Sequence, residues 1–176
     1  NYPQAILDFD EAIRLEPDLA AAHVARDAAL GRLEALGYFE LEQVYARAIQ
    51  RLDQAIRDDP EFVQAYIDRG RLRAQHDSYS QALSNFDQAI LRDPQLATML
   101  QPEINDVNLL WGATLVEDGH YPTAIQRFSK AIHSDPGFAE AYLNRGRVYA
   151  LLENYPQAIL DFDEAIRLDP DLTGAY

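Results

Sequence analysis

Residues 1–19 read NYPQAILDFDEAIRLEPDL, and the same stretch returns as residues 154–172, NYPQAILDFDEAIRLDPDL. The two copies differ at a single position, where Glu16 is replaced by Asp169. Self-similarity of this kind is the signature of a repeat architecture, in which each unit buries its apolar face against its neighbours. We therefore expect the chain to be an array of duplicated helical units.

A shorter motif, Tyr-x-x-Ala-x-x-x-Phe/Leu-x-x-Ala-x-x-x-x-Pro, occurs five times. It begins at Tyr2, Tyr45, Tyr79, Tyr121 and Tyr155 and ends at Pro17, Pro60, Pro94, Pro136 and Pro170. Its apolar positions are three and four residues apart, which places them on one face of a helix. The alanines let a neighbouring helix approach closely, and the large residue between them fills the remaining gap. Since the closing proline lacks an N–H and ends the helix, the motif predicts the second helix of a hairpin.

The segment before each motif predicts the first helix of the same hairpin. Residues 65–70, AYIDRG, match residues 141–146, AYLNRG. Gly70, Gly112 and Gly146 lie within this helix, where a glycine costs about 1 kcal/mol relative to alanine. We expect the missing side chains to permit close contact between helices. Short turns between the two helices are expected at residues 76–78, 119–120 and 153–154.

These residues resemble the tetratricopeptide repeat, a helical hairpin with a usual period of about 34 residues. Arg69 and Arg145 stand beside the helix glycines where the common pattern has Leu, and this "NRG" variant resembles bacterial repeat arrays. The resemblance implies an all-α fold, a right-handed superhelical solenoid of antiparallel helix hairpins. It also implies a protein–protein interaction scaffold that binds a peptide or a partner helix in the concave groove lined by the first helices.

The closing prolines divide the chain into repeats. Successive prolines are 43, 34, 42 and 34 residues apart, so longer and regular repeats alternate. We expect a single solenoid over residues 1–176. Its parts are a half repeat (residues 1–17), a long repeat (18–60), a regular repeat (61–94), a second long repeat (95–136), a second regular repeat (137–170) and the start of another repeat (171–176).

The two long repeats carry insertions of 9 and 8 residues. In the first, residues 20–36 and 39–57 predict two helices, each about one turn longer than usual. In the second, residues 97–104 precede the first helix as a short turn or one loose helical turn, and Pro102 begins that helix because its fixed φ suits a first turn. The insertions either adjust the curvature of the solenoid or form a lip beside a binding site.

Both ends of the array are incomplete. Residues 1–16 predict a second helix without its first, and residues 173–176 resemble the start of another first helix. We therefore read the chain as a fragment of a longer array. Uncapped repeats expose apolar surface, so one expectation is a homo-oligomer formed by end-to-end stacking. The other is that neighbouring repeats of a longer chain cover these faces.

The composition argues against several classes of partner. The chain has 15 Lys and Arg residues and 29 Asp and Glu residues, which gives a formal net charge of −14. Nucleic acids and anionic membranes are bound by clustered basic residues, so we expect neither as a partner. The absence of cysteine excludes disulfides and thiolate metal sites. No apolar run reaches the roughly 20 residues needed to span a bilayer. A repeat protein without cysteine fits a bacterial cytoplasm, so the location that we expect is cytoplasmic.

No motif in the sequence has catalytic or metal-binding spacing. The histidines, His23, His76, His120 and His133, form no pair four residues apart with a carboxylate in a metal-binding arrangement. A glycine-rich phosphate loop and a G-x-S-x-G elbow are also missing. We therefore predict no catalytic residue, no metal and no cofactor, and a scaffold rather than an enzyme. A non-catalytic helical module of a larger multidomain protein is a further alternative.

The resemblance places the binding site on the first helices. The candidates for the concave groove are Tyr66, Asp68, Arg71, Asn108, Tyr142, Asn144 and Arg147. The partner implied is a protein or peptide, with an acidic or C-terminal peptide as one candidate, because Arg71 and Arg147 could make bidentate bonds to a carboxylate. Alternatively, these arginines pair with acidic groups on neighbouring helices.

Other positions of the first helices are expected to be structural. Relatives that clamp a C-terminal carboxylate use Lys where this chain has Val24, Ile67, Leu109 and Leu143, so a full clamp is not expected. Arg69 and Arg145 are expected to pack their stems and to pair with acidic side chains on an adjacent helix. Trp111 occupies the same repeat position and is expected in the core.

Overall fold

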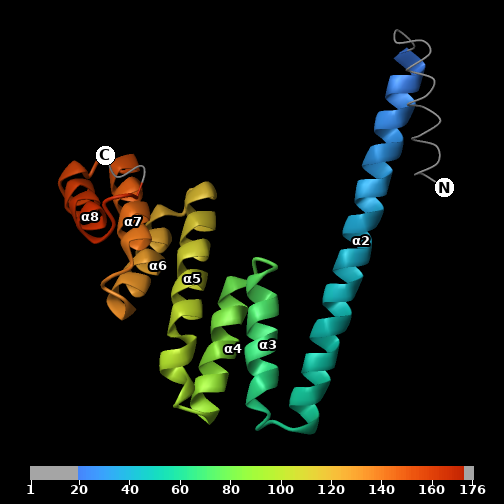
Figure 1. The fold of residues 1–176 in the computed structure, drawn as a ribbon, viewed down its shortest axis with the longest axis horizontal. Coiled ribbons are helices and arrows are strands. Elements are labelled where there is room, and N and C mark those ends of the chain that lie inside the picture. The colour runs from blue at the N-terminus through green and yellow to red at the C-terminus, as the bar shows by residue number, and fades with distance from the viewer. Residues whose placement is uncertain (1–19, 173–176) are drawn as a thin grey trace. The chain divides into compact units, whose positions relative to one another are not determined.

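The computed structural model describes the backbone of residues 20–172 and, from residue 42 on, every side chain in that range. These residues form seven α-helices and no strand, which confirms the all-α prediction (Figure 1). The helices are α2 (Ala20–Asp58), α3 (Val63–Ala74), α4 (Tyr79–Arg92), α5 (Leu96–Glu117), α6 (Tyr121–Ser134), α7 (Ala139–Leu151) and α8 (Tyr155–Leu168). The chain forms two compact units, Asn1–Arg51 and Leu52–Tyr176. Expectations that concern residues 1–19 and 173–176 lie outside the described residues.

Three helix hairpins stack on one another in the unit Leu52–Tyr176. In these hairpins α3 packs against α4, α5 against α6, and α7 against α8, and the two helices of each pair run in opposite directions (Figure 1). Successive hairpins join where α4 contacts α5 and α6 contacts α7. This arrangement is the stack of antiparallel hairpins expected from the repeated motif.

The turns within the hairpins lie where the sequence predicts them. Each contains a residue with positive φ, namely Asp77 at 55°, Gly119 at 75° and Glu153 at 58°. Pro122 and Pro156 lie in the first turns of the helices that follow. A residue in the left-handed backbone conformation, followed by the start of the next helix, therefore separates the two helices of a hairpin.

The second helices end at Asp-Pro pairs. The residue before a proline avoids the helical conformation, and Asp93, Asp135 and Asp169 have φ values of −133°, −135° and −139°. Their carboxylates accept hydrogen bonds from the backbone N–H groups two residues further on, at 3.0, 2.9 and 3.0 Å. The turn between one hairpin and the next is thus fixed by local contacts.

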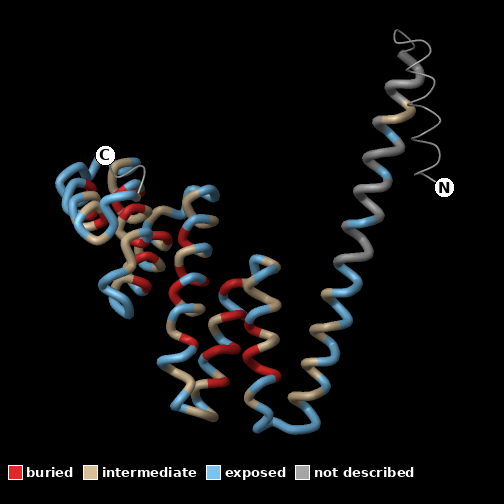
Figure 2. The backbone as a smooth tube through the Cα atoms, viewed as in Figure 1, coloured by how far each residue is buried: buried red, intermediate tan, exposed pale blue. Residues whose placement is uncertain are grey.

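The mid-helix glycines make the close contacts that the sequence predicts. The contact recurs between Gly70 and Phe86, Gly112 and Phe128, and Gly146 and Phe162. A Cβ atom on Gly70 would lie 2.7 Å from a ring carbon of Phe86, so a larger residue would push the two helices apart. Figure 2 shows the buried residues on the facing sides of α3, α4 and α5, where this core lies.

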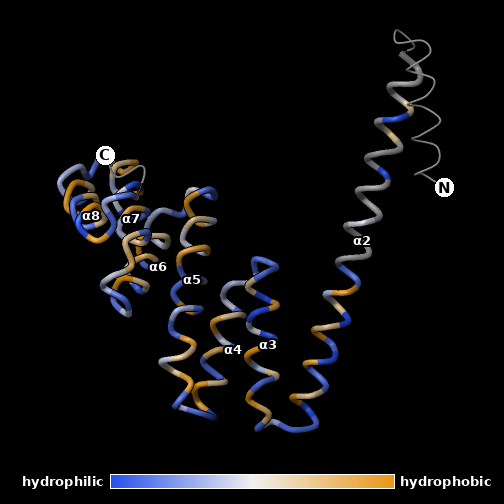
Figure 3. Tube along the Cα trace, in the orientation of Figure 1, coloured by the Kyte–Doolittle hydropathy of each residue, from blue (hydrophilic) through white to orange (hydrophobic). Residues whose placement is uncertain are grey.

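Apolar and polar residues alternate along the coloured parts of the helices in Figure 3. This pattern is that of helices packed on one side and solvated on the other. Within residues 20–172, no helix is both long enough and apolar enough to cross a membrane.

The prediction of two helices in the first long repeat is wrong. Residues 20–58 form one continuous helix of 39 residues, α2. No proline lies between Pro17 and Pro60, and a glycine such as Gly37 costs a helix only about 1 kcal/mol. Because nothing in this stretch is strong enough to end a helix, the chain continues without the turn found in the three hairpins.

The second insertion also differs from its prediction. Pro102 does not begin α5, which starts at Leu96 and carries Pro102 in its interior. An interior proline removes one backbone hydrogen bond and costs about 3 kcal/mol. Leu100 offsets this cost because its side chain is fully buried, and Ile104 packs against the same apolar cluster. The insertion therefore lengthens α5 at its N-terminal end.

Candidate functional site

The first helices α3, α5 and α7 border two successive depressions, which together we call the groove. The first depression has a volume of about 230 Å³ and lies between α3 and α5. It is lined by Arg71, Ala74, Gln75, Phe86, Glu103, Asp106, Val107 and Leu110. Apolar side chains form much of this lining, and charged groups from both first helices accompany them.

The second depression has a volume of about 280 Å³ and lies between α5 and α7. It is lined by Ala113, Val116, Glu117, Phe128, Asn144, Arg147, Val148 and Leu151. Phe128 occupies the repeat position that Phe86 has in the first depression. The groove is thus a repeated feature, and the structure brings three of the predicted residues into it: Arg71, Asn144 and Arg147.

Arg71 is already paired with a carboxylate of the protein. Its Nε donates to Glu103 Oε2 at 2.8 Å and its Nη2 donates to Oε1 at 2.6 Å. This bidentate hydrogen bond lowers the pKa of Glu103 below its ordinary value and raises that of Arg71. Glu103 belongs to the inserted part of α5, so the insertion neutralises an arginine of the preceding hairpin. For Arg71, the expected pairing with a neighbouring helix is confirmed.

Arg147 has no such partner. It is exposed, and its Nη1 lies 3.5 Å from the Oδ1 atom of Asn144 on the same helix. Within residues 52–172 it forms no ion pair. A guanidinium with five donors and one long hydrogen bond is available to a carboxylate from outside the chain.

The first depression is richer in carboxylates than in cations. Asp68 lies 3.9 Å from the Arg71 guanidinium, beyond hydrogen-bond distance. Asp106 lines the depression, and burial raises its pKa, as does the negative charge of Glu103. One arginine therefore stands beside three carboxylates there, whereas Arg147 stands with Glu117 alone in the second depression.

Tyr66, Asn108 and Tyr142 share one repeat position, and none of them lines the groove. Tyr66 and Asn108 are only 5% and 4% exposed. The Tyr66 ring lies beneath the Arg92 guanidinium, 4.2 Å from the ring centroid. Asn108 Nδ2 donates to the Ile104 carbonyl at 2.8 Å. This position faces the second helices, so the resemblance gave the correct helices but not the direction of these side chains.

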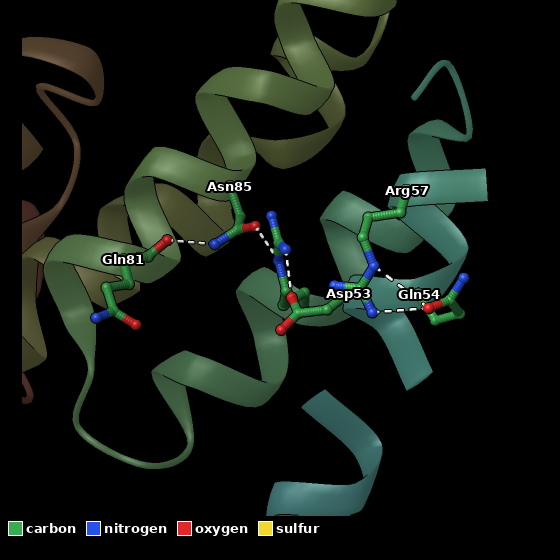
Figure 4. Close-up of polar contacts among 6 residues, drawn as sticks. Asp53, Gln54, Arg57, Gln81 and Asn85 are labelled. Carbon is green, nitrogen blue, oxygen red and sulfur yellow. Dashed lines mark hydrogen bonds and ion pairs between the residues drawn. The ribbon is translucent and has the colours of Figure 1, made fainter. Parts of the chain in front are cut away.

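Arg69 and Arg145 make the structural pairs that the sequence predicts. Arg69 donates to Asn85 at 2.7 Å and to Asp53 at 2.5 Å (Figure 4). Arg145 makes a bidentate pair with Asp161, with both hydrogen bonds at 2.8 Å, which raises the pKa of Arg145. These arginines connect each first helix to the second helix of its own hairpin. Their role is structural, and their contacts give no indication of a ligand site.

In the α5–α6 hairpin, the arginine of this contact lies on the second helix instead of the first. Trp111 stands on the first helix in the place of arginine, partly buried against the core as predicted. Arg127 stands on the second helix and stacks on it, with its guanidinium carbon 3.6 Å from the ring centroid. The sequence reading missed Arg127, although its position relative to Trp111 is that of Asp161 relative to Arg145.

The described residues contain no group of three or more His, Cys, Asp or Glu side chains that could hold a metal ion. His120 precedes α6 in an inter-helix turn, as predicted. His23 lies in the part of α2 whose side chains are outside the description.

A search of solved structures finds chains similar to this one. MamA has a similar structure, with a TM-score of 0.52 and 18% sequence identity over 78% of this chain and 75% of that chain. YrrB, a TPR protein with an unusual peptide-binding site, gives a TM-score of 0.40 at 22% identity over 95% of each chain. The first TPR of Spaghetti, bound to an HSP90 peptide, gives 0.44 at 15% identity over 64% of this chain and 83% of that chain. No curated protein sequence matches.

The family comparison covers most of the sequence. The profile of the tetratricopeptide repeat matches residues 32–97 and 109–173. Both matches contain a complete second helix with its closing proline and its Gly–Phe contact. The chain belongs to the tetratricopeptide repeat family.

Proposed function

We propose that this chain, a protein–protein interaction scaffold by its family, holds an extended peptide of a partner protein along the groove formed by α3, α5 and α7. The observation that carries the proposal is the repetition of the groove depression together with Arg147, a groove arginine without a carboxylate partner in residues 52–172. Rigid helices hold these groups in place before binding, so little conformational entropy is lost when the peptide docks.

Each depression offers apolar contact to a peptide side chain. Val107 and Leu110 line the first depression, and Val116 and Val148 line the second. Leu110 is half exposed, which makes its apolar surface available to a ligand. Successive side chains of one face of an extended peptide could therefore occupy the two depressions in turn.

The polar anchor of the peptide is a carboxylate at Arg147. Arg71 is engaged by Glu103 at 2.6 and 2.8 Å, and the nearby carboxylates of Asp68 and Asp106 repel a second anion. Arg147 has only its 3.5 Å contact with Asn144. An acidic side chain or the C-terminal carboxylate of the partner would gain a charge-assisted, bidentate hydrogen bond there.

A pull-down from a lysate of the source organism tests this proposal. Native protein, Arg147→Glu and the control Arg167→Glu serve as baits, because Arg167 is an exposed arginine on α8 that pairs with Glu164 away from the groove. A partner captured by the native bait and by Arg167→Glu but lost with folded Arg147→Glu supports the groove. Equal capture by all three baits contradicts it.

End-to-end self-association is a second candidate function, favoured by the apolar face of α7 and α8. Tyr155 is 59% exposed, whereas Tyr79, at the same repeat position in α4, is 7% exposed and belongs to the core cluster with Val107 of α5. Leu151 and Ile159 are exposed on the same two helices. Residues 154–172 nearly repeat residues 1–19, which helix α2 directly follows in sequence, so we choose a second copy of the chain as the partner.

Sedimentation equilibrium over a range of concentrations tests this candidate. The native chain should gain mass with concentration, and Tyr155→Lys with Ile159→Lys should remain monomeric because two charges would be placed in the apolar contact. A native chain that stays monomeric at all concentrations contradicts the candidate.

A further inference from the structure

Helix α6 differs in charge from the rest of the molecule. It carries Arg127, Lys130 and His133 and no acidic residue, whereas every other described helix carries at least one Asp or Glu. Lys130 is also the only lysine in a chain of net charge −14. These three residues are three positions apart, so they lie along one side of the helix. We call them the α6 surface.

Arg127 is a fixed cation without a counter-ion. In the neighbouring hairpins the equivalent contact pairs an arginine with Asn85 or Asp161. Arg127 instead stacks on Trp111, and within residues 52–172 it has no hydrogen bond or ion pair. Its Nε is buried without a partner, and burial lowers the pKa of Arg127. A partly desolvated, unpaired guanidinium is stabilised by an anion placed at its exposed edge.

Lys130 adds a second free cation one helical turn further on. It is exposed and forms no ion pair in the described unit. It lines a depression of about 370 Å³ with Gln126, Ser129 and His133. It also borders a depression of about 190 Å³ that contains Asp87, with which it forms no ion pair. The surface beside Lys130 is therefore hollowed and open to a ligand.

We propose that the α6 surface is a second docking site, separate from the groove, for an acidic helix of a partner protein. Charge complementarity supports this choice, because α6 is the one described helix without an acidic residue on a molecule of net charge −14. The Cβ atoms of residues three apart on a helix are separated by about 5–6 Å. Carboxylates at positions i and i+3 or i+4 of a partner helix have the same spacing, so one could meet Lys130 and the next Arg127.

A synthetic acidic helix tests the proposal. The probe is a fluorescent peptide of roughly 15 alanine and glutamate residues, long enough to form a helix, with glutamates at i, i+3 and i+4. Both termini are blocked, so the probe brings no C-terminal carboxylate to the groove. Fluorescence anisotropy should show binding that weakens when ionic strength rises from about 0.05 M to about 0.3 M. A peptide with glutamine in place of glutamate should not bind.

Variants locate the bound probe. Lys130→Gln should weaken binding about fivefold, which is the upper end for an exposed pair, and Arg127→Gln about tenfold because its charge is partly desolvated. Arg127→Lys, which keeps the charge, should restore most of the affinity and so separates loss of charge from loss of packing. Arg167→Gln, on α8 away from both surfaces, should bind the probe like the native protein, and Arg147→Gln reports any probe that binds in the groove instead.

Each of the following results would overturn the proposal: unchanged binding by Lys130→Gln, equal binding of the glutamine peptide, or loss of binding only in Arg147→Gln. Tighter binding of a single-stranded DNA of equal length would also overturn it, since that result would identify a nucleic-acid surface. Failure of the α6 surface leaves the groove untouched, because the pull-down with Arg147→Glu reports on the groove alone.

Discussion

The α5–α6 and α7–α8 hairpins are built on the same repeat but place their charges differently. In α7–α8, the Arg145 guanidinium is neutralised inside the hairpin by Asp161. In α5–α6, Arg127 remains unpaired, while Glu103 from the lengthened α5 neutralises Arg71 of the preceding hairpin. The inserted part of α5 therefore does more than lengthen the helix. Its Glu103 neutralises Arg71, so the first depression of the groove has no free cation at that position.

The largest expected effect comes from undoing the insertion. Leu100→Ala removes a fully buried side chain that holds the inserted part of α5 on the core. We expect the free energy of unfolding to fall by about 2–5 kcal/mol, measured by urea denaturation. Met99→Ala is the control, because Met99 is half exposed and its loss should cost much less. Equal losses would show that the insertion is not packed as described.

Removal of a polar contact should lower the free energy of unfolding by different amounts in the two hairpins, measured by the same urea denaturation. Asp161→Ala leaves Arg145 partly buried without its carboxylate, and breaking a buried pair in this way costs about 3 kcal/mol. Arg127→Ala removes a cation–π contact worth about 1 kcal/mol. If the α5–α6 variant lost as much stability as the α7–α8 variant, the two contacts would be equivalent and the comparison would fail.

Removing Glu103 should make the first depression resemble the second. In Glu103→Gln the Arg71 guanidinium loses its carboxylate partner and becomes available to an anion. An NMR titration with acetate should then shift the Arg71 Nε–H signal about fivefold more than in the native protein, in keeping with one exposed ion pair. The Arg147 signal serves as the internal reference and should respond in both proteins. An Arg71 signal that responds equally in both would contradict the proposed neutralisation.

The smallest expected effect is a pH dependence of stability. Arg71 lowers the pKa of Glu103 below 4.5, its ordinary value. A carboxylate with a lowered folded pKa stabilises the fold at pH values above its unfolded pKa, and this contribution is lost as the pH falls through the folded pKa. The stability difference between the native protein and Glu103→Gln should therefore be constant at neutral pH and shrink below about pH 4.5. A difference that grows on acidification would contradict this assignment.

The features predicted correctly from the sequence are those fixed locally. The Gly–Phe contacts follow from a glycine in one helix and a phenylalanine at a constant distance in the next, and the turns near Asp77 and Gly119 follow from short polar breaks. Arg69 and Arg145 were recognised as structural because they stand beside those glycines. Each of these inferences needs only the spacing within one repeat.

The features predicted wrongly or missed depend on contacts between distant residues. Pro102 reads as a helix start, but burial of Leu100 carries the helix through it. The resemblance implies Tyr66 and Asn108 as groove residues because they lie on first helices, yet both side chains are buried. Family resemblance identifies the helix without showing which neighbouring helix each side chain meets. The pairing of Arg71 with Glu103 joins residues that are 32 positions apart and lie in two hairpins, so no pattern within one repeat predicts it.

The most direct test of the groove compares its two arginines with one ligand. C-terminal peptides selected from a displayed library against the native chain would be titrated by calorimetry into native protein, Arg147→Gln and Arg71→Gln. We predict a carboxylate-containing peptide whose affinity falls about tenfold or more in Arg147→Gln and little in Arg71→Gln, because Glu103 already occupies Arg71. Equal affinity in native protein and Arg147→Gln would contradict the proposed carboxylate site.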